Sequence, residues 1–224
     1  MKIRYLIGPS LILLCFVTIS LAGAPPTGVP THKSPDAYKG LTDQGIAKLK
    51  AGEILILKNI EEGDKPSGMI EAALILDQNI EKVWELNAEK ADWQHKYLPY
   101  LDYCSKVPDT GDKVKIDFKL VIMGVEMKYR VSYVIEKEKY SFHWALDPEY
   151  DNDLKVLKGY WNYYWIDDTH TLCRYGTWFE TGLGVPKFVQ GFLIKRDLPQ
   201  SLTNVKKFVN SGGTWRKEGY KRGD

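Results

Sequence analysis

The ionisable side chains that could carry chemistry in this sequence are few and dispersed. Asp117 and Glu126 fall in otherwise apolar stretches, and His143 stands between Phe142 and Trp144. A carboxylate or imidazole inside an apolar pocket would have a displaced pKa, which suits the acid–base chemistry of a cyclase or dehydratase. On an alternating strand, however, such side chains more often point outward into solvent. We therefore assign no catalytic residue from the sequence.

Motifs for metal binding and nucleophilic catalysis are missing. The four histidines are scattered without the paired spacing of a zinc site. The sequence has no Gly-x-Ser-x-Gly elbow, and the pair Gly182 and Gly184 is too short for a phosphate-binding loop. Beyond the amino-terminal segment, Cys104 and Cys173 could form a disulfide or remain two separate buried thiols. We expect neither a metal nor a cofactor.

Aromatic residues form a more coherent pattern. Trp161, Tyr163 and Trp165 alternate, so they share one strand face, whereas Tyr160 and Tyr164 share the other. Aromatic walls with a few hydroxyl and indole donors suit a flat or elongated apolar ligand, although the same rings could fill a solid core. The candidate ligand-binding residues are Tyr129, Tyr133, Trp144, Trp161, Tyr163, Trp165, Trp178, Phe188 and Phe192.

Periodicity predicts the elements that must position these rings. An apolar strand at 68–77 precedes a helix capped by Asp77 or Asn79 and a second helical piece that ends before Pro99. The period then becomes two, with turn residues between the segments. The six strands predicted there are 101–107, 113–122, 126–137, 140–146, 155–166 and 171–181.

A long amphipathic helix follows the strands. Pro186 suits its first turn, Pro199 should bend it, and Gly212 with Gly213 should end it. Apolar residues at helical spacing give it one broad face. That face comprises Phe188, Val189, Phe192, Ile194, Leu198, Leu202, Val205 and Val209.

Three stretches resemble a known family in their order and spacing. Ile70 to Trp84 is similar to the family's opening strand and following helix, and Ala91 to Leu101 to its short second helix. Gly159 to Phe188 is similar to its last strand pair and the start of its final helix. Together they resemble the START/Bet v1-like (SRPBCC) superfamily, nearest its polyketide cyclase/dehydrase and coenzyme-Q-binding START-domain branches.

That resemblance implies an α+β fold of the helix-grip (Bet v1-like) type. A bent seven-stranded antiparallel sheet would wrap around the long C-terminal helix, with two short helices after the first strand. It also implies a cavity between sheet and helix for a lipid, isoprenoid, sterol or polyketide. We expect the final helix and the loops that face it, at 109–112 and 147–153, to form the gate. Members differ widely in activity, so the fold sets only a prior for function.

The amino terminus predicts export. Lys2 and Arg4 precede an apolar run from Leu11 to Leu21, and the small residues Ala22 and Ala24 follow. The run is short for a membrane span, which needs about 20 residues, although an uncleaved anchor is the alternative. We expect a periplasmic protein in a Gram-negative bacterium and a secreted protein otherwise.

Removal of the signal would leave a nearly neutral chain. The basic count falls from 31 to 29 with the loss of Lys2 and Arg4, against 29 acidic residues, which weighs against nucleic acid as the main partner. The basic end of the chain could touch an anionic lipid surface or simply be solvated.

The expected layout begins with a signal peptide at 1–22 and a Pro-rich tether at 23–40. An N-terminal extension at 41–67 follows, with a weak helix at 41–50 and a short strand at 53–60. The START/Bet v1-like domain then covers 68–211, and a basic disordered tail covers 212–224.

These observations favour an exported, non-catalytic binding or carrier protein for a hydrophobic small molecule, most simply a lipid. One alternative is a cyclase/dehydratase-type enzyme that acts on a polyketide- or isoprenoid-like substrate in the same cavity. The other is an interaction domain whose core is filled and binds no ligand.

Overall fold

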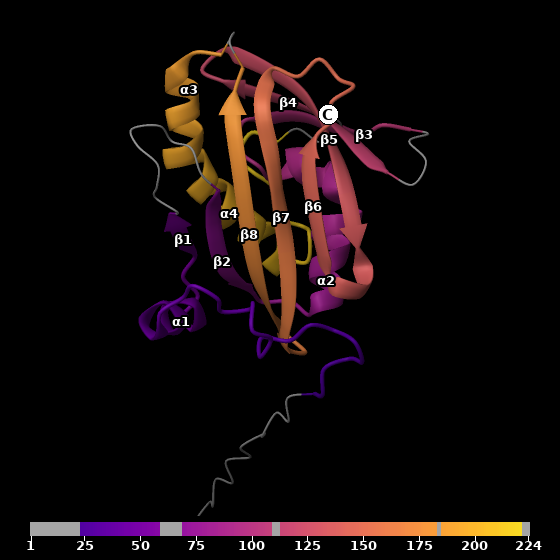
Figure 1. Cartoon of the computed structure of the whole chain (residues 1–224), viewed down its shortest axis with the longest axis vertical. Helices are drawn as coiled ribbons and strands as arrows, with labels where there is room; N and C mark the ends of the chain where they lie inside the picture. The colour runs from indigo at the N-terminus through magenta and orange to yellow at the C-terminus, as the bar shows by residue number, and fades with distance from the viewer. Residues whose placement is uncertain (1–22, 59–68, 109–112, 183–184, 221–224) are drawn as a thin grey trace, which may run out of the picture.

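An eight-stranded sheet organises the protein (Figure 1). The computed structural model describes residues 23–58, 69–108, 113–182 and 185–220. The sheet order is β1-β2-β8-β7-β6-β5-β4-β3, and all neighbouring strands are antiparallel. The strands are β1 (Leu55–Lys58), β2 (Ile70–Leu76), β3 (Leu101–Lys106), β4 (Val114–Ile122), β5 (Val125–Glu136), β6 (Ser141–Leu146), β7 (Leu154–Asp167) and β8 (His170–Thr181).

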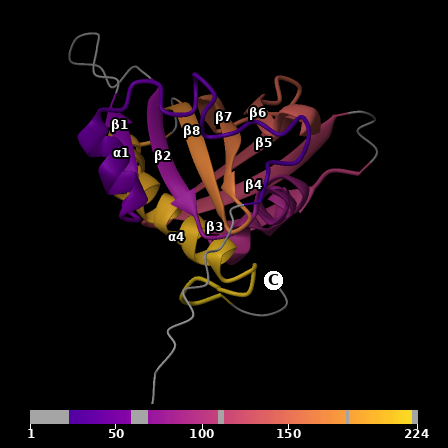
Figure 2. The same ribbon diagram turned by 90° about the horizontal axis from the view of Figure 1, so that it is seen from below.

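The sheet curves around the C-terminal helix, which confirms the predicted helix-grip arrangement (Figure 2). The asparagine at position 79 caps α2, since the Asn79 side chain accepts a hydrogen bond from Lys82 N at 2.8 Å. None of the described helices is long and apolar enough to cross a membrane. The helices are α1 (Asp43–Lys50), α2 (Ile80–Trp84), α3 (Lys187–Phe192) and α4 (Leu198–Asn210), with π-helical turns at Glu85–Glu89 and Leu193–Asp197 and 3₁₀ turns at Ala91–Lys96 and Lys137–Lys139.

The C-terminal helix is irregular just before Pro199, where a bend was expected. Its α3 and α4 segments are joined by the π-helical turn Leu193–Asp197, and Pro199 then occupies the first turn of α4. A proline has no N–H to donate to the preceding turn, so a wider turn ahead of it accommodates the missing hydrogen bond. The π turn matters for the site because it sets the direction in which Asp197 points.

The expectation of seven strands was wrong, because the sheet has eight. The additional strand is β1, which the sequence predicted as a separate short strand in the extension. It pairs with β2, placing Leu55 opposite Ala73 and Lys58 opposite Ile70. Without it, the apolar β2 would present a row of unpaired backbone groups at the edge of the sheet.

Residues 23–40 pack against the sheet, although a free tether was expected. The carbonyl of Pro30 accepts from Trp165 N at 2.8 Å, and Ala37 is fully buried. The Arg174 guanidinium donates to the backbone carbonyl of Ala37 at 3.3 Å. Figure 2 shows this segment on the opposite side of the sheet from α4. The buried Arg174 needs hydrogen-bond acceptors, and the segment's carbonyls provide them.

The part of the basic tail that the structure describes, residues 212–220, contacts the rest of the domain, whereas a disordered tail was expected. The Lys217 ammonium donates to the carbonyls of Leu98 at 3.0 Å and Leu101 at 2.5 Å. These carbonyls lie at the start of β3, so the lysine ties the end of the chain to the sheet. Residues 221–224 lie outside the described residues.

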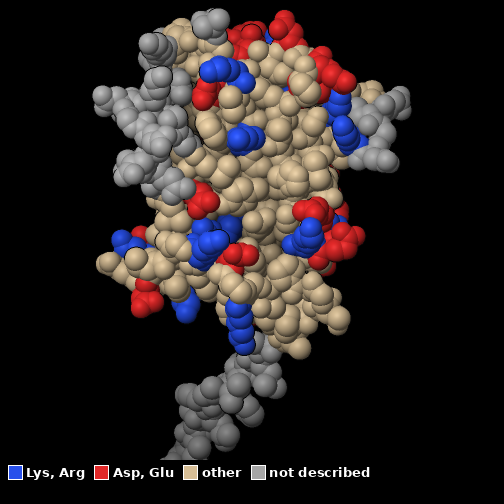
Figure 3. Space-filling view, viewed as in Figure 1, with Lys and Arg blue, Asp and Glu red and all other residues tan. Residues whose placement is uncertain are grey.

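The two sheet faces differ in what covers them. Trp161, Tyr163 and Trp165 point into the main core, and Tyr164 packs with Ala37 in a small outer cluster. The inner face therefore meets the C-terminal helix, and the outer face meets the N-terminal segment. On the face seen in Figure 3, uncharged residues surround a few charged side chains in the middle, and further charged groups of both signs lie at the edges.

Candidate functional site

A cavity of about 190 Å³ lies between the inner face of the sheet and the C-terminal helix. Typical small-molecule sites have roughly 300–1,000 Å³, whereas an engineered apolar cavity of about 150 Å³ in another protein binds benzene. The cavity therefore has room for a small molecule or for one end of a longer molecule. A larger occupant would require the helix to move.

Aromatic rings form much of the sheet side of the cavity. Phe118 and Tyr129 stack at a centroid distance of 5.2 Å. The Tyr175 ring lies 4.6 Å from Trp161 and 5.8 Å from Trp144. Of the rings nominated from the sequence, those that line the cavity are Tyr129, Tyr133, Trp144 and Trp161.

Other nominated rings lie elsewhere. Tyr163 is fully buried, and its hydroxyl accepts a hydrogen bond from Asn87 Nδ2 at 3.0 Å. Trp165 is buried in the main core, and Phe192 packs edge-on against Tyr100 at 5.2 Å. They support the cavity wall from behind or beside it. Phe188 belongs to α3, and its side chain lies outside the described part of the structure.

Trp178 points away from the cavity, which corrects its nomination. The ammonium of Lys158 lies 4.5 Å from the centre of its ring on the outer face of the sheet. Side chains alternate along β8, so Tyr175 and Thr177 face the cavity and Trp178 must face outward. The sequence marked an aromatic residue but did not fix the register of that strand.

Asp197 is the carboxylate that lines this cavity, and the sequence analysis missed it. Burial raises its pKa from 3.8 to about 7, and a hydrogen bond from Ser201 Oγ to Oδ2 at 3.4 Å partly offsets this. Its Oδ1 atom is buried without a hydrogen-bond partner. At neutral pH the group is therefore present in both protonation states.

A helical pattern in the sequence could have revealed Asp197. Leu193, Asp197 and Ser201 are spaced four residues apart, and all three line the cavity. The predicted apolar face includes Leu198 and Leu202 but not Asp197, which directly precedes Leu198. The available signal was its spacing of four residues from Leu193.

Neutral polar groups complete the cavity wall. Gln94 Nε2 donates to the Tyr133 hydroxyl at 3.3 Å. Burial raises the pKa of Tyr175 to about 12, so this hydroxyl stays protonated near neutral pH. The arrangement can offer hydrogen bonds and exchange one proton, which suits either holding a polar end of an apolar ligand or acid–base chemistry upon it.

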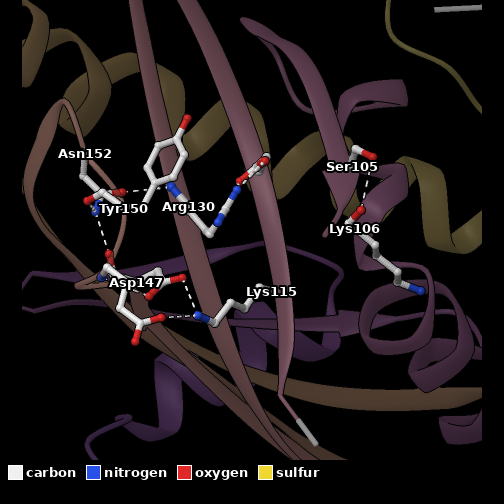
Figure 4. Close-up of polar contacts among 9 residues, drawn as sticks. Ser105, Lys106, Lys115, Arg130, Asp147, Tyr150 and Asn152 are labelled. Atoms are coloured by element: carbon white, nitrogen blue, oxygen red, sulfur yellow. Dashed lines mark hydrogen bonds and ion pairs between the residues drawn. The ribbon is translucent and has the colours of Figure 1, made fainter. Parts of the chain in front are cut away.

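The acid–base candidates from the sequence lie outside the cavity. Asp117 forms a two-point ion pair with Arg130, with N–O distances of 2.6 and 3.0 Å (Figure 4). His143 and Glu126 are exposed. Side chains alternate along a strand, and all three of these point outward. This is the alternative stated above, in which such residues face the solvent.

The loop at 147–153, expected to gate the cavity, is held by polar contacts (Figure 4). Asn152 Oδ1 accepts from Arg130 N at 2.9 Å, and Asn152 Nδ2 donates to the carbonyl of Asp147 at 2.8 Å. Asp147 itself is nearly inaccessible and pairs with a β4 lysine. These contacts favour a fixed loop. The other expected gate, 109–112, lies outside the described residues.

Cys104 and Cys173 are two separate buried thiols, the second of the alternatives above. Burial raises the pKa of Cys104 to about 12, so its thiolate is scarce at neutral pH. Within the described ranges, no three His, Cys, Asp or Glu side chains gather closely enough to hold a metal ion.

Comparison with known sequences finds no matching protein-family model and no similar curated protein. Solved structures do share the fold. A STAR-related lipid transfer protein from Xanthomonas axonopodis has 11% sequence identity and a TM-score of 0.56, over 70% of this chain and 98% of that one.

Two further structures are similar. The Zhui aromatase/cyclase from Streptomyces sp. R1128 has 10% identity and a TM-score of 0.51, over 65% of this chain and 98% of that one. A START superfamily protein from Mycobacterium smegmatis has 14% identity and a TM-score of 0.50, over 64% and 97%. The chain therefore has the helix-grip fold of START/Bet v1-like proteins; at these identities the likeness establishes the fold and leaves the activity open.

Replacing Asp197 by Asn should remove a pH-dependent loss of stability. Because the folded-state pKa is raised from 3.8 to about 7, the folded protein binds more protons than the unfolded chain in that interval. The free energy of unfolding therefore falls as the pH rises through it. Asp197→Asn lacks this component, so its stability relative to wild type should rise by up to about 1.4 kcal/mol per pH unit there. Urea unfolding at several pH values measures the difference.

The matched control is Glu138→Gln, which removes a carboxylate from an exposed turn. Its stability curve should stay parallel to that of the wild type. If the Asp197→Asn curve is parallel as well, Asp197 is not protonated in the folded protein near neutral pH.

Proposed function

We propose that the protein binds or carries a hydrophobic small molecule, most simply a lipid, in the cavity between sheet and C-terminal helix. The observation that carries this proposal is the void of about 190 Å³ behind a wall of Tyr, Trp and Phe rings. Removing apolar ligand surface from water there contributes about 25 cal/mol per Å². Polar side chains at the wall, Asp197 among them, would orient one end of the ligand.

The similar structures support this proposal through their fold. One is named as a lipid transfer protein and another as an aromatase/cyclase. A cavity between sheet and helix would serve either role. We place binding first because the described cavity residues show one carboxylate and no second ionised group to pair with it in a proton relay.

An enzyme of the cyclase/dehydratase type is the second candidate. The observation that favours it is the pKa of Asp197 at about 7, since general acid–base catalysts work best with a pKa near the operating pH. The two functions differ in what leaves the cavity, because a carrier releases its ligand unchanged and an enzyme releases a product.

Native mass spectrometry tests the binding function. The purified chain should take up lipid from an extract, and Leu157→Trp should lower the bound fraction at least about fivefold by filling the cavity that Leu157 lines. Chromatography of the released ligand shows whether it has been converted.

The control for this experiment is Val156→Trp. Val156 adjoins Leu157 on the same strand, so its side chain points to the other face of the sheet. This variant should bind as much lipid as the wild type. Absence of uptake by the wild type, or equal uptake by Leu157→Trp, would contradict the proposed function.

We also propose that the protein is exported, into the periplasm of a Gram-negative host or out of the cell otherwise. The basic, apolar and small-residue pattern of the amino terminus supports cleavage after Ala22. Gly23 lies next to the Asp168 carboxylate, so cleavage after Ala22 would place the new α-ammonium beside an acidic group.

Fractionation of expressing cells, followed by amino-terminal sequencing, tests export. The mature protein should begin at Gly23 and be found outside the cytoplasm, whereas Leu14→Arg, which interrupts the apolar run, should stay inside. Wild-type protein retained in the cytoplasm with Met1 intact would refute the proposal.

Contact of the basic tail with an anionic membrane surface is a further proposal from the sequence. Lys217 is already engaged by backbone carbonyls, so Lys221 and Arg222 are the tail residues to test. Each basic residue near such a surface contributes about 1 kcal/mol. Lys221→Gln with Arg222→Gln should therefore weaken sedimentation with anionic vesicles and leave neutral vesicles unaffected; unchanged sedimentation would count against this contact.

A further inference from the structure

Among the described residues, the cavity wall has an acidic side chain but no basic one. Asp197 contributes a carboxylate, and none of the described residues that line the cavity is Lys, Arg or His. The hydrogen bond from Ser201 reaches Oδ2, while Oδ1 is buried without a partner. An ionised carboxylate in such surroundings is costly unless a counter-ion joins it. A bound ligand can supply that counter-ion.

Aromatic residues line the same cavity as Asp197. Tyr129, Tyr175 and Trp161 belong to its sheet side, across from the helix that carries the carboxylate. Tyr175 in turn contacts Trp161 and Trp144. The carboxylate of the helix thus faces an aromatic wall on the sheet.

This combination is complementary to an organic cation. Aromatic ring faces attract ammonium groups through their quadrupoles, and the attraction grows when the site excludes water. The carboxylate supplies the opposite charge. A ligand with a carboxylate or phosphate at this place would be repelled by Asp197 and would meet no basic side chain among the described lining residues.

Building on the function proposed above, we infer that the cavity selects an apolar molecule that carries an organic ammonium group, held between Asp197 and the rings of Tyr175, Trp144 and Trp161. The volume of about 190 Å³ fits a small aryl or alkyl ammonium, or the ammonium end of a longer amphiphile. Anionic lipids would be excluded from this end of the cavity.

Binding of such a cation depends on the ionised form of Asp197. Affinity for a permanent cation should therefore fall as the pH drops below about 7. The other titratable groups facing the described cavity do not titrate in this range, because burial raises the pKa of each of them. They are Tyr97, Tyr129, Tyr133 and Tyr175.

Three probes of similar size test the inference in NMR titrations of the purified chain. Phenyltrimethylammonium carries the cation, tert-butylbenzene is its neutral isostere, and phenylacetate carries an anion. The cation should bind about tenfold more tightly than the neutral isostere above pH 7, and phenylacetate should bind no better than that isostere. The indole signals of Trp144 and Trp161 report whether the probe enters this cavity.

Variants test the effect of the carboxylate charge on binding separately from the effect of the cavity space. Asp197→Asn should lose the tenfold preference while keeping its affinity for tert-butylbenzene within about twofold, because only the charge is removed. Glu138→Gln, an exposed carboxylate, should behave as wild type. Leu157→Trp should weaken both probes.

The outcomes distinguish this inference from the carrier function. A cation that binds no more tightly than tert-butylbenzene, or a preference that survives in Asp197→Asn, overturns the inference and leaves the lipid-uptake result standing. Tight cation binding without any shift of the Trp144 and Trp161 signals also overturns it, because the cation would then be bound elsewhere.

Discussion

The structure depends on how one helix covers the apolar inner face of a curved sheet. Leu198, Leu202 and Val205 of α4 are buried against that face, yet they leave about 190 Å³ unfilled. A ligand that fills the void would recover contacts that the protein alone does not make.

The outer face of the sheet is covered by other segments of the chain. Arg174 is buried beneath the N-terminal segment and donates to its carbonyls, and Asn152 makes hydrogen bonds within the loop between β6 and β7 and to β5. The inner face is covered by the C-terminal helix, whose α3 and α4 segments meet at a π-helical turn. That turn carries Asp197, so the irregular part of the helix also places the carboxylate in the cavity wall.

Local sequence patterns predicted most of the fold. Alternation placed Trp161, Tyr163 and Trp165 on one face, and turn residues indicated the strand boundaries. The helix cap was narrowed to two residues, of which the structure selects Asn79. Residues 23–40 dock on Trp165, which lies far from them in the sequence, so this contact could not be inferred. The β1 strand was predicted, but nothing in its own pattern shows that it pairs with β2 and joins the sheet. The site was predicted only in part, because strand alternation alone does not show which side chains line the cavity. Trp178 required the register of β8, whereas the four-residue spacing of Leu193, Asp197 and Ser201 was available in the sequence and was not used.

Diffraction from wild-type crystals under xenon pressure tests the central claim most directly, because xenon enters empty apolar cavities. The account predicts an anomalous peak between the rings of Tyr129 and Trp161 and the C-terminal helix, beside Asp197. An interior without a peak, with those rings packed against Leu202 and no space between them, would contradict it.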